Sequence, residues 1–266
     1  RQRQMCIRDS NCNPDGPYHW FKTGWIDKRE EKHLLYLHFT MDDNLSLSEK
    51  IKERYRSMYT GVFYRRYILG LWAMAEGIIY DMFDTAKHVI SNLSELTNAN
   101  CYVSCDYGTQ NATVFLLWCK DRLGRWVCCR EYYYSGRDEE RQKTDTEYAD
   151  DLEQWLDGIK PVKMVIDPSA ASFIAELKKR GYAIKKAKND VLDGIRFVAS
   201  LLNQGKIAIS DQCPNTIKEF GSYIWDQKAS ERGEDKPVKQ HDHAMDALRY
   251  FCYTIIRKPG SISILK

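Results

Sequence analysis

Several features that would narrow the function at once are missing from this sequence. No apolar stretch approaches the roughly 20 residues that a membrane-spanning helix needs, and no secretory signal peptide is visible. We therefore expect no membrane partner and no secretion. No G-x-x-x-x-G-K-S/T motif is present, so we expect no phosphate-cradling loop and no ATP site in this chain. The nine cysteines form no C-x-x-C pair.

The composition is that of a folded protein with little net charge. The 266 residues are enough for one large domain or for a medium domain with an appendage, and 43% of them are hydrophobic. The net charge of +3 is too small to predict a partner, so local charge matters more than the sum. Several cysteines fall in apolar runs, where reduced cysteine packs as a small hydrophobic side chain, namely Cys101, Cys105, Cys119, Cys128 and Cys129. We therefore expect a reducing compartment.

The first residues have an irregular pattern. Residues 1–10 show neither helical nor strand periodicity, and a dense turn sequence, Asn-Cys-Asn-Pro-Asp-Gly-Pro, follows at once at 11–17. Our hypothesis is that the chain is a piece of a longer protein and that residues 1–10 are foreign to it.

Residues 1–98 form a first region with mixed signals. Residues 32–40 alternate enough to predict a strand, and Ser48 opens a helix predicted to run to about Tyr59. A second helix is predicted over 61–69. Polar sequence at 91–100 then indicates a connector at about 70–98. We expect this region to be a small α+β unit.

Residues 99–266 are more regular. Strands predicted at 101–106, 112–119 and 126–134 are joined by short turns and form an antiparallel meander. Next are predicted helices at 144–157, 170–180, 190–203, 214–221 and 241–257, with strands at 162–167, 182–186 and 206–210 between the earlier ones. This order predicts an α/β fold of the ribonuclease H-like type, with a mixed sheet flanked by helices. A right-handed crossover would lay strand 162–167 parallel to and beside strand 101–106.

Three carboxylates stand where such a fold would bring them together. Asp106 and Asp167 close the strands 101–106 and 162–167, and Asp246 borders the apolar stripe of the last helix. A carboxylate cluster is unstable unless it is protonated or occupied by hard cations such as Mg²⁺ or Mn²⁺. The placement therefore predicts a metal-dependent phosphodiesterase site. His243 precedes Asp246 by three residues and shares its side of the helix.

Each of these residues also has an ordinary structural interpretation. Asp167 precedes a proline and could be a helix N-cap, and Asp106 could be a turn residue. Asp242 fits an N-cap better than a metal ligand, and His243 alone is more typical of an exposed or satisfied histidine. Asp246 needs a partner, which could be a metal or an arginine. It is the joint placement of the three aspartates that favours a metal site.

Specific motifs contain these aspartates: Cys-Asp-Tyr-Gly (105–108), Val-Ile-Asp-Pro-Ser-Ala (165–170) and Asp-His-Ala-Met-Asp-Ala-Leu-Arg-Tyr (242–250). They resemble the acidic motifs of the nuclease domain of tailed-phage terminase large subunits. Residues 191–196 and 223–225 also match that family's pattern, so the resemblance covers roughly 100–257. Upstream, residues 11–21 resemble the end of the family's ATPase domain, and 63–77 resemble the segment leading into the nuclease.

The resemblance implies a domain organisation and a function. Residues 1–98 would be a remnant of the ATPase domain with its connector, and residues 99–266 would be the nuclease domain. The chain would be an endonuclease that cuts double-stranded DNA concatemers during viral genome packaging in the host cell cytoplasm. A complete member would also translocate DNA with ATP and bind a portal and a terminase small subunit. We do not expect ATPase activity from this chain alone.

The resemblance also implies a two-metal mechanism. Asp106 would bridge two divalent cations, Mg²⁺ or Mn²⁺, while Asp167 and Asp246 would each complete the coordination of one. The cations would activate a water and stabilise the leaving 3′ oxygen, giving 5′-phosphate ends. His243 stands at the matching catalytic position and could orient a carboxylate or a water.

DNA contact would be largely electrostatic. The densest basic segment contains Lys178, Lys179, Arg180, Lys185, Lys186 and Lys188, and the segment before the last helix contains Lys228, Arg232, Lys236 and Lys239. Either group could instead be a solvated face. Two other functions stay open: a cellular ribonuclease H-like resolvase or transposase, which would lack the segments at 11–21 and 63–77, and a non-catalytic docking module of a packaging complex.

Overall fold

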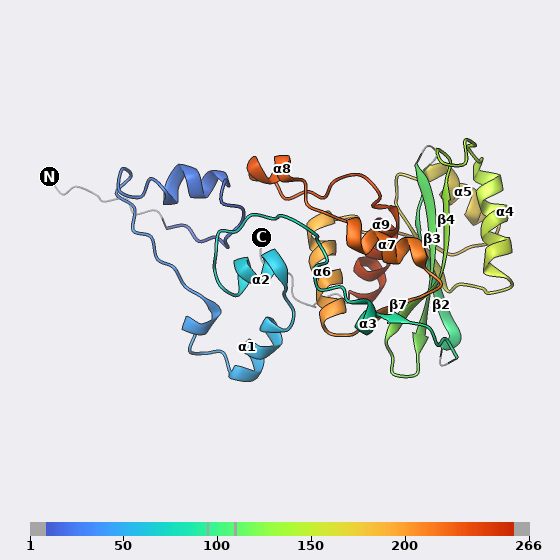
Figure 1. Cartoon of the computed structure of the whole chain (residues 1–266), viewed down its shortest axis with the longest axis horizontal. Coiled ribbons are helices and arrows are strands. Elements are labelled where there is room, and N and C mark those ends of the chain that lie inside the picture. The colour runs from blue at the N-terminus through green and yellow to red at the C-terminus, as the bar shows by residue number, and fades with distance from the viewer. Residues whose placement is uncertain (1–8, 95, 109–110, 258–266) are drawn as a thin grey trace.

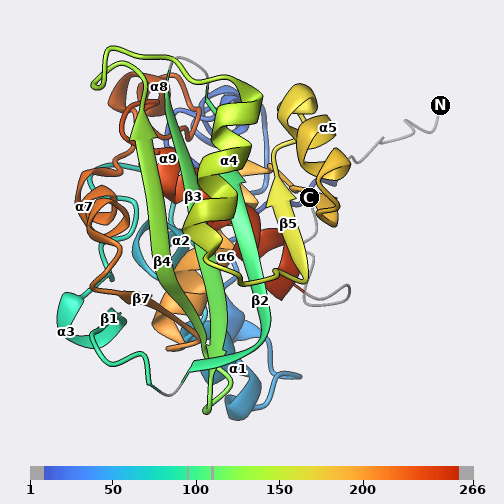
Figure 2. The ribbon, with the colours of Figure 1, turned by 90° about the vertical axis from the view of Figure 1, so that its right-hand side faces the viewer.

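A mixed seven-stranded sheet organises the protein (Figures 1 and 2). The structure is a computed structural model and describes residues 9–94, 96–108 and 111–257. The strand order is β1-β7-β4-β3-β2-β5-β6. The strands are β1 (Val89–Ile90), β2 (Leu96–Asp106), β3 (Ala112–Asp121), β4 (Trp126–Ser135), β5 (Lys163–Ile166), β6 (Ile184–Lys186) and β7 (Ile207–Ser210).

The sheet combines a meander with parallel additions at both edges. β2, β3 and β4 pair antiparallel, as their short connections predict. β5 lies beside β2 and parallel to it, and β6 extends that edge in parallel. β7 pairs in parallel with β4, and β1 pairs in parallel with β7. The predicted ribonuclease H-like mixed sheet, with strand 162–167 beside strand 101–106, is therefore confirmed.

Helices cover both faces of this sheet. α4 (Asp145–Leu156) and α5 (Ala171–Lys179) lie on one face, as Figure 2 shows. α6 (Val191–Asn203), α7 (Pro214–Ser222) and α9 (His243–Phe251) lie on the other, and the π-helical turn η3 (Cys252–Ile256) continues α9. The short α8 (Gln227–Glu231), which the sequence analysis missed, precedes α9. None of the helices in the described ranges has the length and apolar character that crossing a membrane requires.

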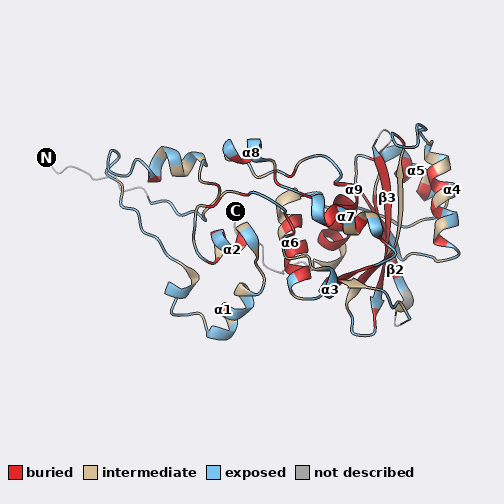
Figure 3. Ribbon diagram, viewed as in Figure 1, coloured by how far each residue is buried: buried red, intermediate tan, exposed pale blue. Residues whose placement is uncertain are grey.

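Two apolar layers result from the alternation of side chains along the strands. Val103 and Cys105 of β2 point towards α4 and α5, where they pack with Phe173. Trp118 of β3 points to the opposite layer and stacks on Phe251 of α9, with ring centroids 4.4 Å apart. Figure 3 shows that burial is concentrated in the sheet, α6 and α9. These layers fix α9 across the centre of the sheet.

The region before the sheet consists of short helices and irregular segments. They are the π-helix η1 (Lys22–Ile26), the 3-10 helix η2 (Met41–Asp43), α1 (Glu49–Arg56), α2 (Gly61–Tyr67) and α3 (Thr85–His88). α1 and α2 match predicted helices, whereas α3 and β1 fall inside the predicted connector.

The strand predicted at 32–40 is wrong. Residues 34–40 have no regular secondary structure, and Leu35, Leu37 and Phe39 are 81%, 61% and 71% exposed. Alternation specifies a strand only where another strand supplies the hydrogen bonds, and no paired strand is found among residues 9–88 of the described chain. That region is therefore helical and irregular rather than α+β.

Part of this region shares a core with the sheet helices. Phe63, Ala75 and Tyr80 belong to the same buried cluster as the inner residues of α6, α7 and α9. The Ile79 amide donates to the Tyr223 carbonyl at 2.8 Å, and the Trp225 amide donates to the Gly77 carbonyl at 3.0 Å. Residues 63–80 therefore pack with the second region. The predicted domain boundary between residues 98 and 99 stays a prediction.

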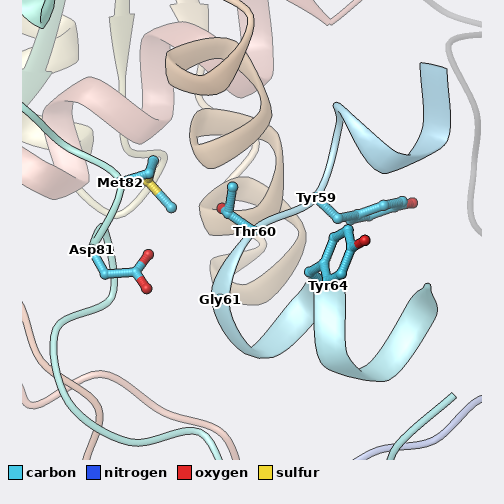
Figure 4. Close-up of a pocket in the computed structure, with 6 residues that line it drawn as sticks. All are labelled: Tyr59, Thr60, Gly61, Tyr64, Asp81 and Met82. Atoms are coloured by element: carbon cyan, nitrogen blue, oxygen red, sulfur yellow. The ribbon is translucent and has the colours of Figure 1, made fainter. Parts of the chain in front are cut away.

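A shallow depression lies where α2 meets the segment at 81–82 (Figure 4). Its volume is about 360 Å³. Gly61 has a positive φ of 53°, and the Asp81 carboxylate oxygens lie 3.5 Å from where a Cβ at Gly61 would stand. The other lining residues are Tyr59, Thr60, Tyr64 and Met82, so none of the predicted site residues borders it.

A buried ion pair ties the first region to the segment before α9. Arg66 of α2 is 2% exposed and forms a forked pair with Asp235, whose side chain is 5% exposed. The Arg66 guanidinium also donates to the Ala73 carbonyl, with Nε at 2.9 Å, and pairs with Asp15 at 2.9 Å. All the donors of a rigid guanidinium fork thus meet oxygen atoms near them.

Replacing Arg66 by methionine is expected to destabilise the protein by about 3–5 kcal/mol, because it leaves the Asp235 carboxylate buried without its partner. Urea unfolding would measure the change. Arg65→Met is the matched control: Arg65 neighbours Arg66 but is exposed, so we expect a change within about 0.5 kcal/mol. Equal effects of the two substitutions would contradict a structural role for the Arg66–Asp235 pair.

Candidate metal centre

The carboxyl ends of β2 and β5 bring Asp106 and Asp167 together. Cys105 is the register partner of Ile166, so the two aspartates are the next residues on adjacent parallel strands, about 5 Å apart in backbone position. Side chains alternate along a strand. Because Cys105 and Ile166 face α4 and α5, Asp106 and Asp167 face the layer that contains α9. The edge that the sequence predicted as a convergence point therefore exists.

α9 places two more of the predicted residues at this edge. His243 Nδ1 is 2.9 Å from Asp106 Oδ2, which joins the first turn of the helix to the end of β2. Asp246, three residues later, is 7% exposed. Burial and the charges of Asp246 and Asp242 raise the pKa of Asp106, and the hydrogen bond with His243 opposes that rise. Asp106, Asp242 and Asp246 thus form one electrostatic cluster.

Nitrogen donors hold the carboxylate of Asp246. Arg249 Nη2 donates to its Oδ1 at 2.7 Å, and Lys239 Nζ donates to its Oδ2 at 3.1 Å. Lys239 also pairs with Asp242 at 3.0 Å. Burial alone would lower the pKa of Lys239, but the charges of Asp246 and Asp242 raise it above its ordinary value. The arginine considered from sequence as an alternative partner of Asp246 is therefore present, together with a lysine.

The structural interpretation of Asp167 as a helix N-cap is wrong, because the N-cap position of α5 is occupied by Ala170. Asp167 Oδ1 accepts from the Ser169 amide at 2.8 Å, as the side chain of a turn aspartate does, while Oδ2 accepts from Asn189 Nδ2 at 3.3 Å. Burial alone would raise the pKa of Asp167, but hydrogen bonds from Ser169, Tyr250 and Asn189 lower it overall. Asp242 occupies the N-cap position of α9, although its side chain makes no capping bond.

Tyr250 is a site residue that sequence reasoning missed. It is 5% exposed and packs against Val165 of β5. Burial raises its pKa, and the charges of Asp106, Asp246 and Asp167 raise it further, so its phenol lies among all three predicted ligands. The available signal was the spacing of four residues from Asp246, which puts both side chains on one helix face.

Arg249 and Asn189 connect the two sides of the site. Arg249 Nη1 donates to the Asn189 carbonyl at 3.0 Å, and Asn189 also binds Asp167 through its side chain. Arg249 runs directly over Gly194 of α6, where an added Cβ would lie 2.6 Å from its Cγ and Cδ. Only glycine admits this close approach. This explains the glycine at position 194, which the sequence alone could not.

Glu219 anchors the amino-terminal turn of α9. Its Oε2 accepts from the Ala244 and Met245 amides at 2.8 and 3.1 Å, and Oε1 accepts from the Tyr133 hydroxyl at 3.0 Å. The side chain thereby satisfies backbone donors that a helix start leaves unpaired. Burial raises the pKa of Glu219 to about 7. Nothing in the local sequence around residue 219 signals this contact, because its partners lie 25 residues later.

The carboxylates at this edge have the right chemistry for a hard divalent cation, but their positions in this structure do not surround one. Within residues 9–94, 96–108 and 111–257, no three His, Cys, Asp or Glu side chains are grouped closely enough to hold a metal ion. The donors are nevertheless carboxylate oxygens, which Mg²⁺ and Mn²⁺ prefer. Burial, and after it the charges of Asp246 and Asp242, raise the pKa of Asp106, so other negative charges stand near this buried carboxylate. A cation would relieve that crowding, so the residues fit such an ion.

The predicted basic residues divide into two groups by position. Lys186 is in register with Ile166, so Lys186 and Lys188 lie at the carboxylate edge, and Lys185 reaches the Thr254 carbonyl at 3.4 Å. α5 runs back from that edge for nine residues, or about 13 Å, which carries Lys178, Lys179 and Arg180 to the opposite end of the strands.

Other contacts of the basic residues sharpen this division. Arg180 is already paired with Asp150, Glu153 and Glu176. Lys228, Arg232 and Lys236 are exposed on α8 and the segment after it, and Lys236 pairs with Glu234 at 2.7 Å. Of that segment's predicted DNA-binding residues, Lys239 is the one that contacts the carboxylates.

Comparison with known proteins identifies this arrangement. A family model described as the terminase RNaseH-like domain matches residues 126–253. Residues 126–253 therefore belong to a terminase ribonuclease H-like domain, whose sheet also contains β2 and β3. The large terminase of a thermophilic bacteriophage, solved in complex with ADP, is 58% identical and superimposes with a TM-score of 0.88 over 93% of this chain and 62% of that one.

Two further relatives are more distant. The terminase large subunit of Escherichia phage T5 is 26% identical over 232 residues, which are 83% of this chain and 52% of that protein. This chain thus spans about half the length of that curated relative. The P22 large terminase nuclease domain, 16% identical with a TM-score of 0.53 over 67% of this chain and 92% of that one, shows the shared fold alone.

Replacing Glu219 by glutamine is expected to change the pH dependence of stability. The pKa of Glu219 is about 7 in the folded chain against an ordinary value of 4.5, so its ionisation disfavours folding. The wild type should therefore lose stability relative to Glu219→Gln as pH rises from about 4.5 to about 7, by on the order of 3 kcal/mol, with a constant difference above that.

Urea unfolding between pH 4.5 and pH 8.5 would measure this difference. Glu139→Gln, at an exposed position after β4, is the control and should give a difference that does not depend on pH. A pH-independent difference for Glu219→Gln as well would rule out a raised pKa at this position.

Proposed function

We propose that this chain is the nuclease part of a terminase large subunit and cuts double-stranded DNA concatemers during viral genome packaging in the host cell. The observation that carries the proposal is the meeting of Asp106 and Asp167, on adjacent strand ends, with the acidic first turns of α9. The match of residues 126–253 to the terminase RNaseH-like domain supports it, as does the similarity to the large terminase of the thermophilic bacteriophage.

Asp106, Asp167 and Asp246 are the proposed ligands of two divalent cations, Mg²⁺ or Mn²⁺. Bound there, such ions would lower the pKa of an attacking water and stabilise the leaving 3′ oxygen. His243 would orient the Asp106 carboxylate through its Nδ1 contact of 2.9 Å. Asn189 and Tyr250 would hold Asp167 in the same way. Arg249 would fix the orientation of the Asp246 carboxylate through its hydrogen bond to Oδ1.

The remaining parts of the proposal concern the longer protein. We place the ATPase remnant and connector in residues 1–98 and the nuclease domain in residues 99–266. ATP-driven translocation and binding of portal and small subunit would belong to the complete terminase. A non-catalytic docking role is a second candidate, because Lys239 and Arg249 already neutralise Asp246. The family match disfavours a cellular resolvase or transposase.

Plasmid cleavage with Mn²⁺, Mg²⁺ or EDTA tests the proposed activity. We expect divalent-ion-dependent cutting, and Asp167→Ala should lower the rate more than about 100-fold, since loss of partners outside the coordination sphere alone costs about 10- to 100-fold. Asp138→Ala, at an exposed turn after β4, is the control and should cut like the wild type.

The negative outcome is also informative. If neither Mn²⁺ nor Mg²⁺ supports plasmid cleavage by the folded wild type, the activity either needs the rest of the terminase or does not exist. Thermal unfolding with and without Mn²⁺ separates these cases, because Mn²⁺ stabilisation that is lost in Asp167→Ala requires a metal site. No stabilisation in the wild type would favour the docking role.

The position of the basic residues predicts how DNA binding responds to charge removal. Lys186→Gln with Lys188→Gln should weaken binding to duplex DNA and reduce the dependence of log K on log salt by about 1 per lost phosphate contact. The matched pair Lys178→Gln with Lys179→Gln removes the same charge at the far end of α5 and should change both quantities less. Filter binding at about 50–200 mM NaCl with Ca²⁺ would measure the affinity and its salt dependence. Equal losses of affinity in the two double variants would refute a special role of Lys186 and Lys188 in DNA binding.

A further inference from the structure

Lys239 makes an unusual pair of contacts for an exposed lysine. Its side chain is 63% exposed, whereas the Asp242 and Asp246 side chains that it holds are 7% and 10% exposed. The ammonium nitrogen is 3.0 Å from Asp242 Oδ2 and 3.1 Å from Asp246 Oδ2. A flexible cation that solvent can reach thus covers two carboxylates that solvent scarcely reaches.

Arg249, the other cation on Asp246, is held in a different way. Its side chain is 2% exposed, and it donates to the Asn189 carbonyl at 3.0 Å as well as to Asp246 at 2.7 Å. The Gly194 backbone lies directly against its side chain. Arg249 is therefore a fixed part of the site, and of the two cations on Asp246 only Lys239 has freedom to leave.

The surroundings of Lys239 allow such a movement of its side chain. The backbone before it is anchored, since the Val238 amide donates to the Ile224 carbonyl at 3.0 Å and the Lys236 carbonyl accepts from the Asp226 amide at 2.8 Å. A cavity of about 590 Å³ opens beside Lys239, between the first turn of α6 and residues 235–239, and Val191, Leu192 and Pro237 line its apolar part. The ammonium group can thus turn away into open space without a change in the backbone.

We propose that Lys239 competes with divalent cations for Asp246, so that its ammonium group must leave Oδ2 before an ion binds there. This inference rests on the proposed function, because it takes Asp246 as a metal ligand. A Mg²⁺–carboxylate distance is about 2.1 Å, and Lys239 Nζ is 3.1 Å from the same oxygen. Two cations on Oδ2 would therefore stand within about 5 Å of each other, where like charges repel strongly in a poorly solvated site.

The competition also assigns Lys239 a role different from that of the other basic residues. A lysine that only attracts DNA would stand free in solution, as Lys228 does on the exposed side of α8. Lys239 instead neutralises carboxylates whose mutual repulsion would otherwise destabilise the fold. Its departure when an ion binds would keep the charge of the site nearly balanced in both states.

Mn²⁺ binding without DNA tests this inference directly. Free Mn²⁺ would be measured by electron paramagnetic resonance during titration of the full chain at low ionic strength. We expect Lys239→Met to bind Mn²⁺ about three- to tenfold more tightly than the wild type, since removing one competing charge at a partly exposed site has an effect of that order. Lys239→Arg keeps the charge and should bind as the wild type does. Lys236→Met removes a neighbouring charge that pairs with Glu234, and it should leave the affinity unchanged.

Each other outcome overturns the inference in a recognisable way. Unchanged or weaker binding by Lys239→Met, with wild-type binding that Asp167→Ala abolishes, would refute the competition and leave the proposed metal site standing. Equal gains in Lys239→Met and Lys236→Met would reduce the effect to general electrostatics. No Mn²⁺ binding by the folded wild type or by Lys239→Met would remove the proposed metal site and the competition together.

Discussion

The packing of α9 across the sheet is the constraint on which the candidate site depends. Phe251 stacks on Trp118 at 4.4 Å and also meets the Trp126 ring at 5.1 Å. Trp118 in turn donates to the Ser104 hydroxyl at 3.0 Å within the sheet. This aromatic contact fixes the helix in rotation and in height. His243, Asp246 and Tyr250, which lie earlier on the same helix, are thereby directed to the ends of β2 and β5.

Charge compensation is the second organising force. Four carboxylates lie near the helix start, on Asp106, Asp167, Asp242 and Asp246, and each has a nitrogen-bearing partner. The partners are His243, Asn189, Lys239 and Arg249, respectively. Burial of an unpaired carboxylate is costly, so these donors stabilise a cluster that would otherwise protonate or open. Three of these carboxylates, on Asp106, Asp167 and Asp246, are also the proposed metal ligands. Stability and the proposed catalysis therefore require the same charges, with Lys239 as the exchangeable one.

The sequence predicted the local elements well because their signals are local. Alternation in β2 placed Cys105 on one face and Asp106 on the other. The meander and the crossover to β5 followed from turn lengths and handedness. The prediction of a strand at 32–40 failed because alternation does not report whether a partner strand exists.

Long-range partners could not be predicted from the sequence. Glu219 binds amides 25 and 26 residues away, and the position of Arg249 depends on the absence of a Cβ at Gly194. Such contacts arise only once the layers are assembled, and composition or periodicity carries no record of them.

The loop between α8 and α9 carries two ion pairs that connect different parts of the structure. Near its start, Asp235 is locked to Arg66 and so to the first region of the chain. Near its end, Lys239 holds Asp242 and Asp246. The stretch of backbone between the two ion pairs is short, and from Lys236 to Val238 it is bound to residues 224–226. A movement of the Lys239 side chain alone would therefore leave this backbone and the Arg66–Asp235 pair in place. The segment before α9 is thus held at both ends by ion pairs, one to the first region of the chain and one to the candidate site.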